Sequence, residues 1–109
     1  MIAEIAKHQQ KIMDLCKQYE VIRLGLFGSA ARGDFDPETS DLDFLVLFDR
    51  REGMDYVHRY FDLSRDLESL FGRKVDLITE GSVKKERFRQ AIEKDLVWIY
   101  ERPGRATAA

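Results

Sequence analysis

An apolar run at residues Leu42–Phe48, with the sequence LDFLVLF, constrains the fold more than any other part of this chain. After its first residues, apolar side chains occupy both alternating faces of the segment. That pattern is typical of a central strand that is covered on both sides, and it disfavours a half-exposed edge strand. The chain is therefore expected to build a sheet with other elements packed over this strand.

Two amphipathic helices are predicted to supply that cover. The first spans residues 2–19, and its apolar stripe consists of Ile5, Ile12, Leu15, Cys16 and Tyr19. The second spans residues 56–71 and ends before Gly72, a typical helix stop. Its predicted apolar stripe consists of Val57, Tyr60, Phe61, Leu67, Leu70 and Phe71.

Shorter segments complete an alternation of helices and strands. Strands are predicted at residues 23–27, 74–79 and 97–100, and helices at 29–32 and 83–94. The polar link at 33–40 is too short for a crossover, so the strands on either side of it are expected to be antiparallel. We expect one α/β (α+β) domain over residues 1–102, with a small mixed sheet of about four strands and helices packed on it. Residues 103–109 show no pattern and are expected to fray.

Charge and cysteine content exclude several classes of protein. The formal net charge is -2, which argues against a dedicated nucleic-acid binder with a strongly basic face. Cys16 is the single cysteine, so no internal disulfide can form and a reducing compartment, the cytoplasm, is expected. No segment approaches the roughly 20 apolar residues of a membrane span.

Two aspartates open the central strand. Asp41 and Asp43 are two residues apart, so their side chains project from the same face. Two carboxylates a few ångströms apart repel each other by about 4 kcal/mol at an effective dielectric constant of 20. A divalent cation offsets that repulsion, and Mg²⁺ prefers one or two carboxylates together with substrate phosphate oxygens. A calcium loop beginning at Asp34 is excluded, because Thr39 and Leu45 stand where its glycine and bidentate glutamate are required.

A Gly-Ser pair precedes the aspartates at the end of another predicted strand. Gly28 allows a sharp turn and the close approach of a ligand. Ser29 opens a short helix, where it can cap the helix or present its hydroxyl and N–H groups to a phosphate. Alone, a Gly-Ser turn or an Asp-x-Asp strand end is unremarkable, but together they suit metal-assisted phosphoryl transfer.

The combined motif resembles a known family. The stretch Gly-Ser-Ala-Ala-Arg-Gly at residues 28–33, followed by Ser-Asp-Leu-Asp at 40–43, is similar to the signature of the DNA polymerase β-like nucleotidyltransferase superfamily. Its fuller form resembles the minimal nucleotidyltransferase (MNT) branch, often found beside a helical HEPN-domain partner. The resemblance implies a two-layer nucleotidyltransferase fold and a third carboxylate on a later strand, which is placed at Asp76.

The resemblance also implies an activity. A minimal nucleotidyltransferase would move a nucleoside monophosphate, AMP from ATP, to a tyrosine hydroxyl of a HEPN-type toxin and so act as its antitoxin. Asp41, Asp43 and Asp76 would be its catalytic metal ligands for two Mg²⁺ ions, with Mn²⁺ an alternative. Gly28 and Ser29 would hold the triphosphate. Neither the base preference nor the oligomeric state is readable from the sequence.

Asp76 and Arg32 each have a second interpretation. A single carboxylate in an apolar strand is costly unless it is paired or metal-bound. Asp76 is therefore either a ligand or a sheet-edge residue paired with Arg73, Lys74 or another basic residue. Arg32 either contacts the triphosphate or, as the favoured interpretation, braces the loop by pairing with Asp34, Asp36 or Asp41. Ser40 is expected to organise the turn before the aspartates.

Competing functions stay open at this point. The chain could inhibit its partner by forming a complex without catalysis, or it could modify a small-molecule hydroxyl. His8 and His58 are interpreted as solvated and Cys16 as a core residue. The basic segment 84–89 is interpreted as a solvated helix face. Trp98 and Tyr100 are predicted to be exposed and are candidates for an interface.

Overall fold

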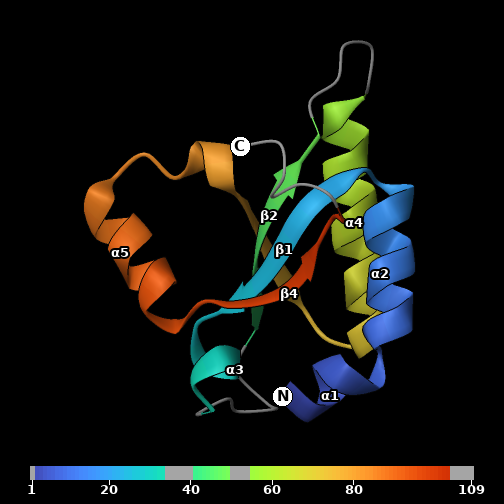
Figure 1. The fold of residues 1–109 in the computed structure, drawn as a ribbon, viewed down its shortest axis with the longest axis horizontal. Helices are drawn as coiled ribbons and strands as arrows, with labels where there is room; N and C mark the ends of the chain where they lie inside the picture. The colour runs from blue at the N-terminus through green and yellow to red at the C-terminus, as the bar shows by residue number, and fades with distance from the viewer. Residues whose placement is uncertain (1, 34–40, 50–54, 104–109) are drawn as a thin grey trace.

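A computed structural model describes residues 2–33, 41–49 and 55–103 of the chain. Its centre is a four-stranded sheet with the strand order β3-β2-β1-β4 (Figure 1). The strands are β1 (Val21–Phe27), β2 (Leu42–Phe48), β3 (Val75–Thr79) and β4 (Val97–Glu101). β1 is antiparallel to β2 and β4, whereas β2 and β3 are parallel. The structure confirms the mixed four-stranded sheet, the antiparallel pairing across the 33–40 link and the internal position of β2.

Helices cover the two faces of the sheet unequally. α2 (Gln9–Gln18) and α4 (Tyr56–Phe71) lie side by side on one face, and α5 (Glu86–Asp95) lies over the other (Figure 1). The main core, beneath α2 and α4, contains Leu24, Phe44 and Leu67, all fully buried. A smaller core beneath α5 consists of Phe27, Leu45, Val83 and Ile92. Successive residues of β2 therefore point alternately into the large and the small core.

α4 shows why residues 56–71 form one helix. Its N-cap Asp55 accepts a hydrogen bond from the His58 N–H, and Gly72 ends the helix in the left-handed conformation at φ 66°. The predicted apolar stripe is wrong at Val57 and Phe61, which are 59% and 62% exposed. The buried face follows Arg59, Leu63 and Leu67 at i, i+4 spacing, so Val57 and Phe61 lie on the outer side of the helix.

The N-terminal segment forms two helices where one was predicted. α1 (Ile2–Lys7) and α2 are separated at His8, whose φ and ψ of -105° and 18° are not helical. The ring of His8 packs edge-on against the ring of Phe71, with 5.6 Å between their centroids. His8 is therefore half-buried, and the prediction that it is solvated is wrong. This contact explains by packing why the helix is interrupted at His8.

The C-terminal elements are also shifted from the prediction. A 3-10 turn, η1 (Glu80–Ser82), follows β3, and α5 begins at Glu86 because Val83 packs into the smaller core. Tyr100 is buried, contrary to the prediction, whereas Trp98 is exposed as expected. Residues 34–40 and 104–109, which include most of the predicted loop and tail, lie outside the described residues. In the described ranges, no helix has the length and apolar character needed to cross a membrane.

Candidate functional site

The sheet brings together the aspartates of two strands. Asp41 directly precedes β2 and Asp43 is its second residue, and both are half-buried. Across the parallel ladder, Asp43 lies opposite Asp76 of β3. Asp76 is exposed, while its neighbours Val75 and Leu77 point into the large core. Asp43 and Asp76 therefore project on the α5 side of the sheet, on the same face as Asp41.

Gly28 completes the inner wall of this site. It follows β1 with φ 73° and ψ -156°, a conformation essentially restricted to glycine. A Cβ at this position would lie 2.4 Å from Asp43 Oδ2, so any side chain would displace the carboxylate. Glycine is thus required at this position for two reasons: the backbone conformation, and the lack of space for a Cβ beside Asp43.

Ser29 is the first residue of the short helix α3 (Ser29–Arg32), as predicted. The N-cap of α3 is Gly28, so Ser29 does not have the capping role that was one of its two interpretations. The Gly28 carbonyl accepts hydrogen bonds from the N–H groups of Ala31 and Arg32, each at 3.1 Å. Among the described residues, the Ser29 side chain makes no hydrogen bond, which leaves its hydroxyl available to a ligand.

The electrostatics of the site centre on Asp43. Burial raises the pKa of this carboxyl above its ordinary range, and the charges of Asp76 and Asp41 raise it further. Arg32 acts in the opposite direction and lowers the pKa. The three aspartates therefore repel one another through a partly desolvated region, a cost that a bound cation would reduce.

The donor set fits a hard cation that is held partly by substrate. In the described part of the chain, no group of three His, Cys, Asp or Glu side chains is arranged to hold a metal ion. Mg²⁺ sites commonly use one or two carboxylates and complete their octahedron with waters and phosphate oxygens. Asp41 and Asp43, close in sequence and on one face, supply that minimal set, with Asp76 adjacent.

The alternative pairing of Asp76 is not seen. Within the described ranges Asp76 makes no ion pair with Arg73 or Lys74. Its partner across the ladder is another carboxylate. Among the residues that the structure describes, no ion pair accounts for an acid in this strand.

Arg32 has a partner that the sequence analysis missed. Its Nη1 donates to Asp95 Oδ2 at 3.0 Å, joining the end of α3 to the end of α5. The predicted partners Asp34 and Asp36, and the turn residue Ser40, lie outside the described residues. Arg32 makes no ion pair with Asp41 in the described structure. Nothing in the α5 sequence distinguishes Asp95 from the other acids of that helix.

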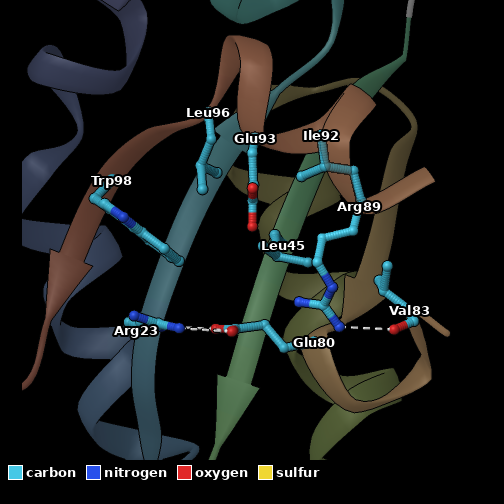
Figure 2. Close-up of a pocket in the computed structure, with 9 residues that line it drawn as sticks. All are labelled: Arg23, Leu45, Glu80, Val83, Arg89, Ile92, Glu93, Leu96 and Trp98. Carbon is cyan, nitrogen blue, oxygen red and sulfur yellow. Dashed lines mark hydrogen bonds and ion pairs between the residues drawn. The ribbon is translucent and has the colours of Figure 1, made fainter. Parts of the chain in front are cut away.

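A small pocket lies on the same sheet face, between the strands and α5 (Figure 2). Its volume is about 80 Å³, well below the roughly 300 Å³ at which small-molecule pockets begin. Arg23 crosses it, with Nε and Nη2 donating to the two Glu80 oxygens at 2.7 Å and its guanidinium 4.4 Å from the Trp98 ring centroid. The pocket is too small and too internally paired to hold a nucleotide.

Other reactive side chains are accounted for elsewhere. Cys16 is fully buried, and burial raises the pKa of its thiol to about 12, so it is a core residue as predicted. His58 is exposed and pairs with Asp55 at the start of α4. The side chains of residues 84–89 are exposed, as predicted, and Arg89 Nη2 donates to the Val83 carbonyl at 2.9 Å.

Comparison with known proteins gives consistent matches. The profile of the "Nucleotidyltransferase domain" family matches residues 9–99. A protein of Thermococcus cleftensis, "Protein adenylyltransferase MntA", is 37% identical over 86 residues, covering 79% of this chain and 82% of that protein.

Two solved structures share the fold. One is a toxin-antitoxin with AMP-PNP, with a TM-score of 0.66 and 23% identity over 87% of this chain and 74% of the other. The second is a tri-AMPylated Shewanella oneidensis HEPN toxin in complex with MNT antitoxin, with a TM-score of 0.62 and 19% identity over 95% and 78%. At these identities the likenesses establish the fold alone.

Proposed function

This chain belongs to the nucleotidyltransferase-domain family and is a nucleotidyltransferase, and from that premise we propose its reaction. It transfers AMP from ATP, with Mg²⁺, to a hydroxyl of a protein partner. The partner is a HEPN-domain toxin, the acceptor is a tyrosine, and the modification silences the toxin. The chain is on this proposal the antitoxin of the pair.

One observation carries the proposal: Asp43 and Asp76 are register partners on neighbouring strands, and the Gly28 turn lies against the Asp43 carboxylate. A phosphate held at the Gly28–Ser29 turn would lie directly beside these acids. Asp41 and Asp43 would hold the cation that accompanies the triphosphate. Bound Mg²⁺ supplies positive charge that neutralises the phosphates and stabilises the charge developing on the α-phosphoryl group.

The chain's own residues then have separate roles. Gly28 and Ser29 hold the triphosphate by backbone N–H groups and the serine hydroxyl at the start of α3. The acceptor oxygen attacks the α-phosphorus, and the bond from that phosphorus to pyrophosphate breaks. Asp76, the register partner of Asp43 on β3, accepts the hydroxyl proton.

Donor and acceptor are supported by relatives. The Thermococcus cleftensis relative is named a protein adenylyltransferase, which supports AMP as the group and protein as the acceptor. The two structural neighbours are toxin-antitoxin complexes, one containing AMP-PNP and the other an AMPylated HEPN toxin. These support ATP as donor and a HEPN protein as partner.

The test is transfer of label from α-³²P-ATP, in Mg²⁺, to the HEPN-domain protein encoded beside this chain. Asp41→Asn and Asp43→Asn are expected to reduce transfer by at least about 10³-fold, because each removes a charge that is needed in the transition state. Asp49→Asn is the matched control, since it changes an aspartate at the opposite end of β2. It is expected to keep wild-type transfer.

Three results would overturn the proposal. Tight complex formation without label, under any nucleotide, identifies a non-catalytic inhibitor. Label appearing only on a small-molecule hydroxyl identifies a different acceptor. Full transfer by both site variants shows that these aspartates do not bind the catalytic metal.

A further inference from the structure

α5 ends in an acid that reaches back to the helix beside the aspartates. Asp95 Oδ2 accepts from Arg32 Nη1 at 3.0 Å, and the Asp95 side chain is 15% exposed against 46% for Arg32. A carboxylate in the last turn of a helix is disfavoured by the helix dipole. The ion pair with Arg32, in which only the Asp95 side chain is largely shielded from solvent, offsets part of that cost.

Packing fixes Asp95 relative to the sheet. The next residue, Leu96, lies over β1 at Gly25, where a Cβ would be 2.6 Å from Leu96 Cδ1 (Figure 2). The Leu96 N–H also donates to the Glu93 carbonyl as α5 ends. The absence of a side chain at Gly25 thus lets the end of α5 sit directly on β1, which holds the Asp95 backbone in place.

Arg32 lies between Asp95 at the end of α5 and the aspartates of the candidate site. It is the last residue of α3, whose N-cap Gly28 contacts Asp43, and its N–H donates to the Gly28 carbonyl. Its positive charge lowers the pKa of the Asp43 carboxyl against the effect of burial. One arginine is therefore placed between an acid of the site and an acid of α5.

We propose that Asp95 is a positioning residue, which holds the Arg32 guanidinium beside the Gly28–Ser29 turn, ready to meet the triphosphate. An arginine side chain that is not held in place loses rotamer entropy when it binds a ligand. Anchoring it beforehand lowers that cost, which is how preorganisation raises affinity. The inference rests on the proposed function only in requiring a nucleotide at this turn.

The test measures nucleotide binding separately from transfer. Isothermal titration calorimetry with Mg²⁺ and α,β-methylene-ATP, which cannot release pyrophosphate, is performed on the full chain. Asp95→Asn is expected to raise the Kd about tenfold, as the loss of an outer partner of a ligand-binding side chain commonly does. Asp95→Glu keeps the charge and is expected to stay closer to wild type.

A double-mutant cycle separates positioning from general stability. Introduced into Arg32→Ala, Asp95→Asn is expected to change the Kd by less than about twofold, because the side chain it positions is gone. The matched control is Asp49→Asn, which breaks a similar pair: Arg102 Nη1 to Asp49 Oδ2 at 2.9 Å, with exposures of 37% and 18%. Asp49 directly follows β2 and lies six residues beyond Asp43, about 20 Å away along the strand direction. Its loss should therefore lower thermal stability similarly but leave the Kd unchanged.

The outcomes are distinct. The inference is overturned if Asp95→Asn binds the analogue as wild type does, if it loses the same factor in the Arg32→Ala background, or if the wild-type chain binds no nucleotide. Wild-type binding that depends on Asp95, with no transfer to any protein, would overturn the proposed function alone.

Discussion

The two faces of the sheet are built from the same strands but follow different rules. On β2, the residues that face α2 and α4 are Leu42, Phe44 and Val46, all fully buried. The alternating positions that face α5 begin with Asp43 and continue with Leu45, which joins a core of only four buried residues. One face therefore supplies most of the buried apolar surface, and the other holds repelling carboxylates.

The difference teaches where this small domain obtains its stability. Apolar burial contributes roughly 25 cal/mol per Å², and most of it lies beneath α2 and α4. The α5 face contains a small cavity, ion pairs and a carboxyl whose pKa is raised by burial and by like charges. Functional sites commonly break the rules of a well-packed fold, and the rest of the molecule compensates for the loss.

The same leucine-to-alanine truncation on each face tests most directly whether the two faces contribute unequally to stability. Leu24→Ala, on β1 in the large core, is expected to lower the free energy of unfolding by about 4 kcal/mol. Leu45→Ala, on β2 in the smaller core, is expected to cost about 2 kcal/mol, because Leu45 already borders a cavity and has fewer neighbours to lose. Urea unfolding monitored by circular dichroism gives both values. Equal losses would show that the two faces contribute alike.

The next effect concerns two glycines that flank α3. Gly28→Ala is expected to cost about 2–3 kcal/mol and to abolish nucleotide binding, because its φ is 73° and its Cβ would meet Asp43 Oδ2. Gly33→Ala is the matched control: its φ is 93°, but no atom of the described residues lies within 4 Å of the added Cβ. It is expected to cost about 1 kcal/mol, the strain of a left-handed residue, and to retain binding. Similar binding losses in both variants would remove the special role of the Gly28–Asp43 contact.

Sequence reasoning succeeded best where local patterns determine the structure. The run LDFLVLF predicted a central strand, and β2 has those bounds in the sheet. The short helix at Ser29–Arg32 and the helix Tyr56–Phe71 were also predicted with their observed ends, since glycines mark where each stops. Local chemistry decided these elements.

The sequence did not predict features that depend on contacts between distant segments, such as the buried face of α4 and the partner of Arg32. Val57 and Phe61 fit an apolar stripe, but the face that α4 turns to the sheet is set by packing and includes Arg59. Arg59 donates to the carbonyls of Tyr19 and Asp49, which no periodicity reveals. The pair between Arg32 and Asp95 joins residues 63 apart in sequence, and many acids would have been equally plausible partners.

The candidate site lies between these extremes. Asp41 and Asp43 were placed on one face by strand alternation alone. Asp76 was placed by the family resemblance, with its position within an apolar strand as a second argument. The register that sets Asp43 opposite Asp76 depends on how β2 and β3 align, which is a tertiary property. The contact of Gly28 with Asp43 is likewise visible only in three dimensions. The roles of all these residues stay predictions until transfer is measured.

The smallest expected effect is the pH dependence of stability that the α5 face introduces. Burial, and then the charges of Asp76 and Asp41, raise the pKa of Asp43 in the folded protein above its unfolded value of about 3.9. In the window above that value the folded state binds more protons than the unfolded state, so the free energy of unfolding falls as pH rises. Asp43→Asn removes this term. Its stability should equal that of wild type at pH values below the window and exceed it above, in urea midpoints measured without metal.

Adding Mg²⁺ at neutral pH gives a further test of the difference in stability between wild type and Asp43→Asn. A cation that binds the folded state alone raises stability in proportion to RT ln(1 + [Mg²⁺]/Kd), so wild type should gain and Asp43→Asn should gain less. The advantage of the variant over wild type should therefore shrink as Mg²⁺ is added. If Mg²⁺ stabilises both proteins equally, Asp43 does not bind the cation, and the repulsion on the α5 face must be offset by the nucleotide or by the partner protein.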